Sequence, residues 1–517
     1  MQTVIRNHKK RKKVCSMNDA KRKKYSQITK QTVFSFATSI LTLLIMILAM
    51  PILTRGLSLE EYGAYSIIYT TVLIMIVVLE FGFTSYFLTK FPGMRMEKER
   101  KTFFSITAFN SAIVLALLAL AFVPFINAGI VSFLKLSEYQ TEFNVGLLII
   151  FFGVLFRLFV SKVQADRKIE LANIASLLYN GLWLIALVAF FVIFKRIFLS
   201  EVIAIWLAGS LITLLVTMNF AFKPGTYLKT IKKAGKIKRF LGKIDFLEIK
   251  RALKFSLPLL FVMVAAWIID ALGKYFLNYF SNKESVAIFS FSYSIVGALL
   301  TLSAALVSTL YPYISETWHR KKNHHFLFNA TLKYGLIVLL PSTIAILAMR
   351  EQIITLIAGG KYLPASSIIV IMLPFPILSF LMNIRYYNLL LRERTKTIAL
   401  VYLIGIIISI TANIILVPKM GAEGAAIALV ISFIAMYLMM LVICKTHFKW
   451  NFKFLNLWKI ILASAIMGII MALLNPQVLL TKLLTAIAGG IIYLALLWVM
   501  KVFTEEEIDF LKGLLRF

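Results

Sequence analysis

Long apolar stretches recur from one end of this sequence to the other, and each is long enough to cross a lipid bilayer. A helix rises about 1.5 Å per residue, so about 20 apolar residues span a hydrocarbon core of about 30 Å. The composition agrees, because 60% of the 517 residues are hydrophobic and only 15% are charged. The sequence therefore predicts an all-α polytopic membrane protein. A β-barrel would show short alternating segments instead.

We predict about fourteen transmembrane helices in two groups. The first group is 33–54, 64–89, 103–127, 143–162, 172–194 and 198–221, and the second is 255–279, 285–310, 327–349, 363–391, 396–417, 424–444, 457–474 and 479–500. The predicted organisation is a basic cytoplasmic tail (1–32), an N-lobe (33–221), a basic cytoplasmic loop (222–254), a C-lobe (255–444), and two extra helices with a cytoplasmic C-terminus (445–517).

The net charge of +33 is distributed unevenly along the chain. With the N-terminus inside, the cytoplasmic segments carry about 45 of the Lys and Arg and the outer segments about 9, which is the positive-inside pattern. Tyrosines cluster partly at span ends, as in an aromatic belt. The sequence thus predicts a multi-pass protein of the inner or plasma membrane with both termini in the cytoplasm. We expect the basic segments to contact anionic lipid and not nucleic acid, because no loop is long enough for a basic domain.

Two stretches of the chain resemble each other in a way that indicates an internal repeat. They are Leu53-Thr-Arg-Gly-Leu-Ser-Leu-Glu-Glu-Tyr-Gly-Ala-Tyr-Ser66 and Leu277-Asn-Tyr-Phe-Ser-Asn-Lys-Glu-Ser-Val-Ala-Ile-Phe-Ser290. When they are aligned without a gap, Leu53 meets Leu277 and Ser66 meets Ser290. Two membrane lobes of similar plan, joined by a basic loop, are typical of many transporters.

Charged side chains within the apolar spans are costly and are therefore candidates for function. Asp270 lies past the middle of its span, and Lys274 follows one turn later on the same helix face. This pair is either a structural ion pair or a site where a proton or cation exchanges with a substrate group. Glu80, late in the second span, is a second candidate for ion coupling.

Two arginines and several asparagines also lie inside apolar sequence. Arg157 and Arg385 either extend to the cytoplasmic interface or face a cavity, where a guanidinium group suits phosphate binding. Asn180 and Asn383 either connect helices through hydrogen bonds or line a sugar-sized cavity.

The sequence patterns of enzymes and of metal sites are missing. There is no Gly-x-Ser-x-Gly, no His-Glu-x-x-His and no phosphate-binding Gly-x-x-x-x-Gly-Lys-[Ser/Thr]. Cys15 and Cys444 cannot form a disulfide framework or a zinc-binding pattern. We predict no catalytic residues, no metal and no cofactor. A membrane-embedded glycan ligase or polymerase is the less favoured alternative, because every predicted outer loop is short.

Short motifs along nearly the whole chain resemble one transporter family. They are the element Leu53–Ser66 quoted above, Leu79-Glu-Phe-Gly-Phe83, Ile269-Asp270, Gly359-Gly-Lys-Tyr-Leu-Pro-Ala365 and Gly421-Ala-Glu-Gly-Ala-Ala-Ile-Ala428. In order and spacing they resemble the polysaccharide-exporter branch of the multidrug/oligosaccharidyl-lipid/polysaccharide (MOP) exporter superfamily, which contains O-antigen and teichuronic-acid flippases. Glu80 replaces the usual Asp of that family, and Lys274 stands where the family often has an apolar residue.

This resemblance implies a fold and a function. The implied fold is two six-helix lobes in a V with two C-terminal helices added. The implied function is translocation of a polyprenyl-diphosphate-linked oligosaccharide to the outer leaflet, with glycan polymerases or ligases as candidate partners. The alternative in the same superfamily is a cation-coupled multidrug antiporter. The candidate residues are Arg157, Arg385, Lys274, Asn180 and Asn383 for substrate binding, and Asp270 and Glu80 for ion coupling.

Overall fold

The computed structural model describes residues 34–35, 37–90, 112–118, 121, 129–166, 168–221, 246–319, 324–444, 456–474 and 478–503. Within these ranges, every regular element is a helix. Twelve of the described helices are long and apolar enough to cross a membrane. The longest of them, α16 (Thr395–Cys444), is two helices that meet at a kink at Gly421. It therefore contains both predicted spans 396–417 and 424–444, and the predicted all-α membrane fold is confirmed.

The helices of the first half follow the predicted spans. They are the first helix (Ala37–Gly56), α2 (Leu59–Leu79), α3 (Phe83–Lys90), α5 (Gln140–Ala165), α6 (Ile169–Phe194) and α7 (Leu199–Ala221). The predicted span 64–89 is divided between α2 and α3, because α2 ends at Leu79 and Gly82 has a φ of 70° that favours glycine. The basic tail and most of the predicted span 103–127 lie outside the described residues.

In the second half, the helices begin and end at slightly different residues from those of the predicted spans. Its helices are α10 (Phe246–Phe280), α11 (Lys283–His319), α12 (His324–Ala348), α13 (Arg350–Ile357), α14 (Ala365–Met372), α15 (Pro374–Leu391), α16, α18 (Leu457–Leu474) and α19 (Leu479–Val499). The predicted span 363–391 is divided at Leu373, since Pro374 suits the first turn of a new helix. α10 begins at Phe246, inside the predicted loop 222–254.

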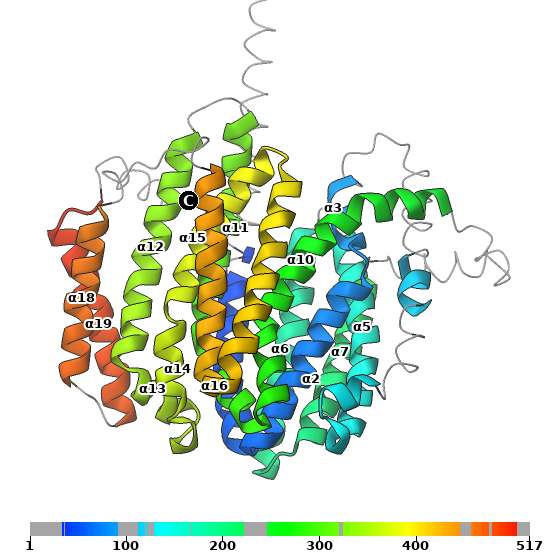
Figure 1. The fold of residues 1–517 in the computed structure, drawn as a ribbon, viewed down its shortest axis with the longest axis horizontal. Helices are drawn as coiled ribbons and strands as arrows, with labels where there is room; N and C mark the ends of the chain where they lie inside the picture. The colour runs from blue at the N-terminus through cyan, green and yellow to red at the C-terminus, as the bar shows by residue number, and fades with distance from the viewer. Residues whose placement is uncertain are drawn as a thin grey trace, which may run out of the picture.

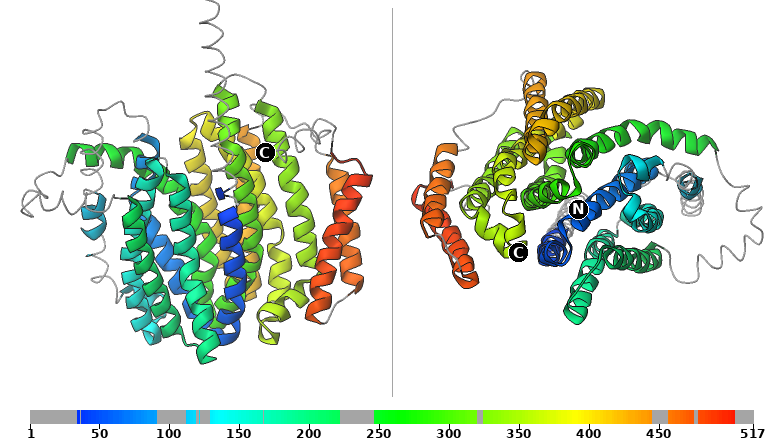
Figure 2. Two further views of the ribbon diagram at one scale, coloured as in Figure 1. Left: turned by 180° about the vertical axis from the view of Figure 1, so that it is seen from behind. Right: turned by 60° about the horizontal axis from the view of Figure 1, so that its bottom comes forward.

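The helices form two groups that lie side by side. In Figure 1, α2, α5, α6 and α7 form one group, and α11 to α16 form the other, with α10 between them. We call these groups the N-lobe and the C-lobe, and we count the first helix with the N-lobe and α10 with the C-lobe. The first helix lies between the two groups (Figure 2). The pair α18 and α19 packs at the far edge of the C-lobe, where the Tyr493 hydroxyl donates to the Ile337 carbonyl at 2.8 Å.

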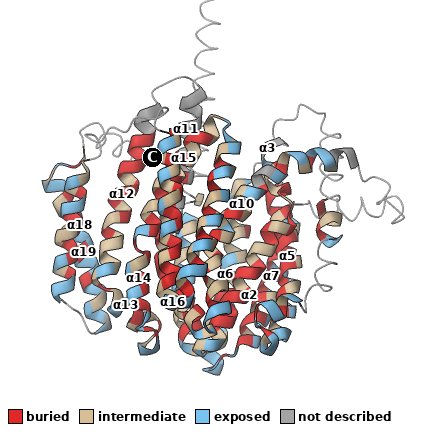
Figure 3. Cartoon of the chain, in the orientation of Figure 1, coloured by how far each residue is buried: buried red, intermediate tan, exposed pale blue. Residues whose placement is uncertain are grey.

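Burial shows which helix is central. In the apolar window of α2, 72% of the residues are buried, against 22% for α6 and 22% for the window of α19 (Figure 3). α2 contacts α10 and α11 of the C-lobe through polar groups. The Ser66 hydroxyl donates to Ser290 on α11 at 2.6 Å, and Thr71 and Tyr275 on α10 have hydroxyl oxygens 3.0 Å apart. The two lobes therefore meet along α2.

The two copies of the internal repeat pack directly on each other. Ser66 and Ser290 are equivalent in the ungapped alignment, and their hydroxyls form a buried hydrogen bond where α2 crosses α11. Gly63 allows this close crossing, because a Cβ atom at this position would overlap the backbone carbonyl of Lys283. Equivalent residues that contact each other must lie near an axis of approximate twofold symmetry, so the structure supports the repeat predicted from the sequence.

Two reciprocal sets of hydrogen bonds join the lobes at the end where α2 begins and α10 ends, which we call the closed end. The Thr54 hydroxyl of the N-lobe lies 3.3 Å from the Ile357 carbonyl of the C-lobe and shares its proton with the Met50 carbonyl of its own helix at 2.9 Å. Its repeat equivalent, Asn278 of the C-lobe, donates to the Leu134 carbonyl of the N-lobe at 2.6 Å. Two lysines repeat the pattern: Lys361 donates to the Leu57 carbonyl at 2.7 Å and Lys135 to the Tyr279 carbonyl at 2.8 Å.

Ion pairs at the closed end are more exposed than these bonds. Lys283 contacts Glu60 at 3.1 Å and Glu138 at 3.2 Å, but the two carboxylate side chains are 53% and 74% exposed. Exposed ion pairs contribute about 0 to 1 kcal/mol. Burial also lowers the pKa of the Lys361 ammonium, an effect that the nearby Glu61 partly offsets. Hydrogen bonds to backbone carbonyls therefore contribute most of the polar contact at this end. They include three from the exposed Arg55 guanidinium to the carbonyls of Thr355, Leu356 and Ile357, at 2.9, 2.7 and 3.1 Å.

A paired cysteine substitution tests the crossing of the repeats. With Cys15 and Cys444 replaced by serine, the double variant Ser66→Cys/Ser290→Cys should form a disulfide on mild oxidation, because the two hydroxyl oxygens are 2.6 Å apart. After oxidation and denaturation, the protein should then take up no maleimide-polyethylene glycol. Ser66→Cys combined with Ser464→Cys on α18 is the control and should stay fully reactive. Full reactivity of the first pair would contradict the crossing.

Candidate functional site

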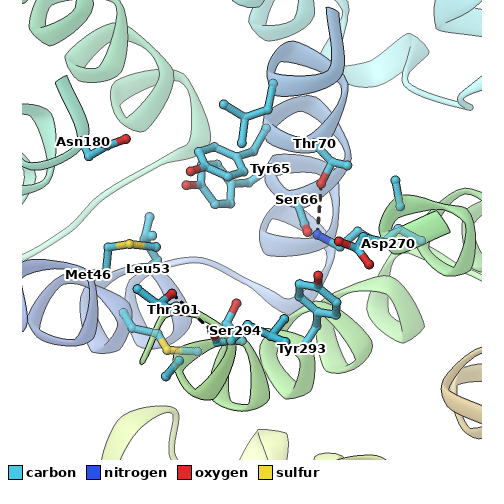
Figure 4. Close-up of a pocket in the computed structure, with 18 of the residues that line it drawn as sticks. Met46, Leu53, Tyr65, Ser66, Thr70, Asn180, Asp270, Tyr293, Ser294 and Thr301 are labelled. Atoms are coloured by element: carbon cyan, nitrogen blue, oxygen red, sulfur yellow. Dashed lines mark hydrogen bonds between the residues drawn. The ribbon is translucent and has the colours of Figure 1, made fainter. Parts of the chain in front are cut away.

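A cavity of about 470 Å³ lies between the lobes (Figure 4). Its walls come from the first helix, α2 and α6 of the N-lobe and from α10 and α11 of the C-lobe. Leu53, Tyr62 and Ser66, which are close to the closed end, form one part of the wall. This volume lies within the range of about 300 to 1,000 Å³ typical of small-molecule sites.

Aromatic side chains form the N-lobe wall of the cavity. Tyr62, Tyr65 and Tyr69 are spaced three and four residues apart on α2, which places them on one helix face. Their neighbouring ring centroids are 5.9 Å and 5.6 Å apart. Trp206 of α7 stands behind them, 5.1 Å from the Tyr69 ring and 5.7 Å from the Trp183 ring of α6. Trp183 lines the cavity with the tyrosines, so the wall is continuous across two helices.

The C-lobe wall carries both charges of the cavity. Among the described residues that line it, Asp270 and Lys274 of α10 are the only charged ones. The Lys274 amine donates to the hydroxyl of Thr70 on α2 at 3.0 Å and lies 5.6 Å from the ring centroid of Tyr293. The Tyr293 side chain lies beside the Asp270 carboxylate (Figure 4), whose Oδ1 atom is buried without a partner. This polar cluster therefore joins the two lobes in the middle of the cavity (Figure 4).

Asn180 is the third predicted site residue in the cavity wall. Its side chain is exposed and donates to the Ser176 carbonyl, one turn earlier on α6, at 2.9 Å. The structure thus brings Asn180 of α6 together with Asp270 and Lys274 of α10, from two widely separated parts of the sequence. Sequence reasoning missed the aromatic wall, although the spacing of the three tyrosines on α2 was visible in the sequence.

Glu80 and Arg157 form an ion pair with each other, and neither lines the cavity. The Arg157 Nε atom lies 2.6 Å from Glu80 Oε2, and Nη2 lies 3.1 Å from Oε1, a bidentate arrangement within the N-lobe. The Glu80 side chain is 0% exposed and also accepts from Thr84 at 2.9 Å. A carboxylate at the C-terminal end of a helix opposes the helix dipole, so Glu80 requires a cation beside it. Arg157 supplies that cation.

Arg385 and Asn383 lie on α15, and neither is among the residues that line the cavity. The Arg385 guanidinium lies 5.5 Å from the ring centroid of Tyr437 and forms a hydrogen bond with Cys444, both on α16. Asn383 is half-buried. Of the basic residues predicted to bind substrate, only Lys274 faces the cavity in this conformation. The described cavity lining is therefore aromatic with one cation and one anion, and it does not include Arg157 or Arg385.

Comparisons with known proteins now identify the family. The family described as "Polysaccharide biosynthesis protein" matches residues 28–318, which is more than half of the chain. The chain belongs to this family. Among curated relatives, the probable low-salt glycan biosynthesis flippase Agl15 of Haloferax volcanii is 21% identical over 32% of this chain and 37% of its own length. Lipid II flippase MurJ of Bacillus subtilis is 24% identical over 38% of this chain and 40% of its own length. The match thus spans less than half the length of these relatives.

Solved structures share the fold over most of the chain. Lipid II flippase MurJ in an inward closed conformation has a TM-score of 0.73 and 19% identity, and the match covers 90% of this chain and 98% of that one. An inward-facing multidrug resistance MATE family transporter of the MOP superfamily has a TM-score of 0.61 and 15% identity, covering 80% and 97%. These structures show that the chain shares their fold, while the family match confirms the predicted membership of a polysaccharide-biosynthesis family.

The pairing of Glu80 with Arg157 can be tested by stability. Arg157→Met leaves the buried Glu80 carboxylate without its cation, and we expect a loss of about 3 kcal/mol in the free energy of unfolding. The double variant Arg157→Met/Glu80→Gln removes both charges and should recover most of this loss. Thermal unfolding in detergent, followed by tryptophan fluorescence, measures both variants. Equal destabilisation by the single and the double variant would show that the pair does not neutralise a buried charge.

Proposed function

We propose that this protein is a flippase that moves a polyprenyl-diphosphate-linked oligosaccharide from the cytoplasmic to the outer leaflet for assembly of a cell-surface polysaccharide. The observation that carries the proposal is the cavity between two related lobes, which holds one cation and is closed at one end by reciprocal bonds. Family membership and the flippases among the relatives support the same function.

The polar cluster suggests how a headgroup is held. Lys274 supplies the one cation that lines the described cavity, and its present acceptor, the Thr70 hydroxyl, is neutral. A diphosphate oxygen is a stronger acceptor for an ammonium group than a hydroxyl. We therefore assign Lys274 to the diphosphate and Asn180 to the glycan, while the polyprenyl tail stays in the lipid. Arg385 and Asn383 contribute only in a conformation that brings α15 to the headgroup.

Asp270 is the group best suited to couple transport to an ion. Its Oδ1 atom is buried without a hydrogen-bond partner, which is costly for an acid within a membrane unless it has a function. It lies in the same cluster that links α10 to α2, so a proton or cation bound there acts directly on the contact between the lobes. Glu80, which is already paired with Arg157, has a structural role in this proposal.

The closed end is the outer end in this proposal. The basic segment 222–245 connects the end of α7 to the start of α10, and the basic segment 445–455 connects the end of α16 to the start of α18. These helix ends lie on the side of the molecule opposite to the closed end (Figure 1). By the positive-inside rule that opposite side is cytoplasmic. Headgroups would enter from the cytoplasm, and rocking of the lobes would break the bonds of Thr54 and Asn278 to open the outer side.

The aromatic cavity with a buried acid also favours a second candidate, a cation-coupled multidrug antiporter. Aromatic rings and a carboxylate attract organic cations, and MATE family transporters share the fold. Lys274 argues against this function, because its ammonium lies in the same cluster as Asp270 and repels a second cation. Overexpression in a drug-sensitive host discriminates: resistance to cationic drugs would favour the antiporter, and unchanged sensitivity the flippase.

Neutralising the charges of the cavity should stop transport. In vesicles with a fluorescent polyprenyl-diphosphate-linked oligosaccharide, we expect Asp270→Asn and Lys274→Met each to lower the translocation rate at least about tenfold. The double variant Asp270→Asn/Lys274→Met has no unpaired buried charge, so it should fold normally and remain inactive. Asn219→Ala, which removes a membrane-embedded amide that donates only to the Leu215 carbonyl, is the control. Normal translocation by the double variant would exclude both residues from the mechanism.

Removing the reciprocal bonds should open the closed end. The variant Thr54→Val/Asn278→Leu loses two interlobe hydrogen bonds of about 1 kcal/mol each, so the outward-open population should rise up to about thirtyfold. A cysteine placed at Ser294, with Cys15 and Cys444 replaced by serine, reports access to the cavity. Labelling by a membrane-impermeant maleimide from the outer side should increase accordingly. Glu138→Gln breaks only an exposed ion pair and should leave labelling unchanged. If it raised labelling as much as Thr54→Val/Asn278→Leu does, the bonds of Thr54 and Asn278 would not be what holds this end closed.

A further inference from the structure

We propose that Tyr62, Tyr65, Tyr69 and Trp183 are the sugar-binding wall of the cavity and that this wall selects a headgroup of uncharged sugars. We call these residues the aromatic wall. The inference rests on the proposed flippase function and specifies its substrate class. It follows from the division of the cavity into an uncharged aromatic side on the N-lobe and a charged side on the C-lobe.

The aromatic wall is held rigidly in place before any ligand arrives. Tyr62 is 5% and Tyr65 is 7% exposed, so most of each ring is already fixed by neighbouring side chains. Trp206, which is 2% exposed, packs behind Tyr69 and Trp183 and prevents their rings from turning away. At the closed end, Tyr62 contacts the buried Tyr362 of the C-lobe edge-on, with ring centroids 6.0 Å apart. Rigid rings bind without loss of side-chain entropy.

Sugar rings suit such a wall. One face of a pyranose ring presents C–H bonds of slight positive charge, which pack favourably against the negative face of an aromatic ring. The hydroxyl groups at the edge of the sugar then need hydrogen-bond partners. Ser66, Thr70, Ser294 and Thr301 line the same cavity and provide hydroxyl groups around the wall. The combination of a large apolar surface with a few polar groups is typical of sites that orient a ligand.

The charges decide between neutral and acidic sugars. The described lining holds one cation, Lys274, and one anion, Asp270, so it carries no excess positive charge. A diphosphate that engages Lys274 leaves no second cation for a carboxylate on the glycan. A uronic acid stacked on the aromatic wall would place its charge near negative ring faces and Asp270, away from bulk water. The cavity thus favours a diphosphate-linked glycan without acidic groups.

The experiment uses the full chain in vesicles with two fluorescent probes. The first probe is an undecaprenyl-diphosphate carrying a neutral N-acetylhexosamine disaccharide, and the second has a uronic acid in place of its terminal sugar. Wild type should move the first at least about tenfold faster. Tyr69→Ala should slow the neutral probe about tenfold, because a stacked ring is lost, whereas Tyr69→Phe should keep its rate within about threefold. Leu215→Ala, on the exposed side of α7, is the control for a large-to-small change.

The outcomes separate this inference from the proposed function. If wild type moves both probes equally, or if Tyr69→Ala moves the neutral probe as wild type does, the flippase function stands and the aromatic wall is not the sugar site. If wild type moves neither probe, the flippase function itself fails. Loss of transport in Tyr69→Ala with an unchanged unfolding midpoint, together with activity in Tyr69→Phe, supports stacking; equal loss in both tyrosine variants would overturn it.

Discussion

The architecture depends on one close helix crossing at the centre of the molecule. α2 and α11 approach each other where Gly63 has no side chain, and the buried Ser66–Ser290 hydrogen bond lies at the crossing. In a membrane, the gain from burying apolar side chains between helices is small, because lipid is equally apolar. Small residues and hydrogen bonds between helices therefore decide how the lobes associate. The polar cluster and much of the cavity wall lie beside this crossing, on α2, α10 and α11.

The distribution of charge around the cavity follows from that arrangement. The N-lobe contributes an uncharged wall from α2 and α6, and α10 of the C-lobe contributes Asp270 and Lys274. Lys274 reaches across to Thr70, so the charged groups are also part of the contact between the lobes. A ligand that draws Lys274 away from Thr70 alters the same contact that must change when the lobes move. Binding and conformational change are thereby connected through one side chain.

Much of the fold could be predicted from the sequence, because apolar length and loop charge act locally. The repeat was visible because Ser66 and Ser290 stand at matching positions, and the depth of Asp270 and Lys274 marked them as unusual. The partner of Arg157 could not be predicted, since Glu80 is 77 positions away in sequence and meets it only after α2 and α5 pack. Arg385 likewise looked like a cavity residue, but packing turns it toward Tyr437 on α16. The tyrosines of α2 were not singled out, because sequence alone does not show which face of α2 meets the cavity.

The symmetry of the bonds at the closed end has a consequence for leakage. Thr54 and Asn278 each donate to a carbonyl of the opposite lobe, so any tilt that separates the lobes loads both bonds together. Because donors from both lobes cross this end, separating the lobes there breaks bonds on each side and leaves buried backbone carbonyls without partners. Such a seal opposes small separations of the lobes, through which protons and small ions would leak.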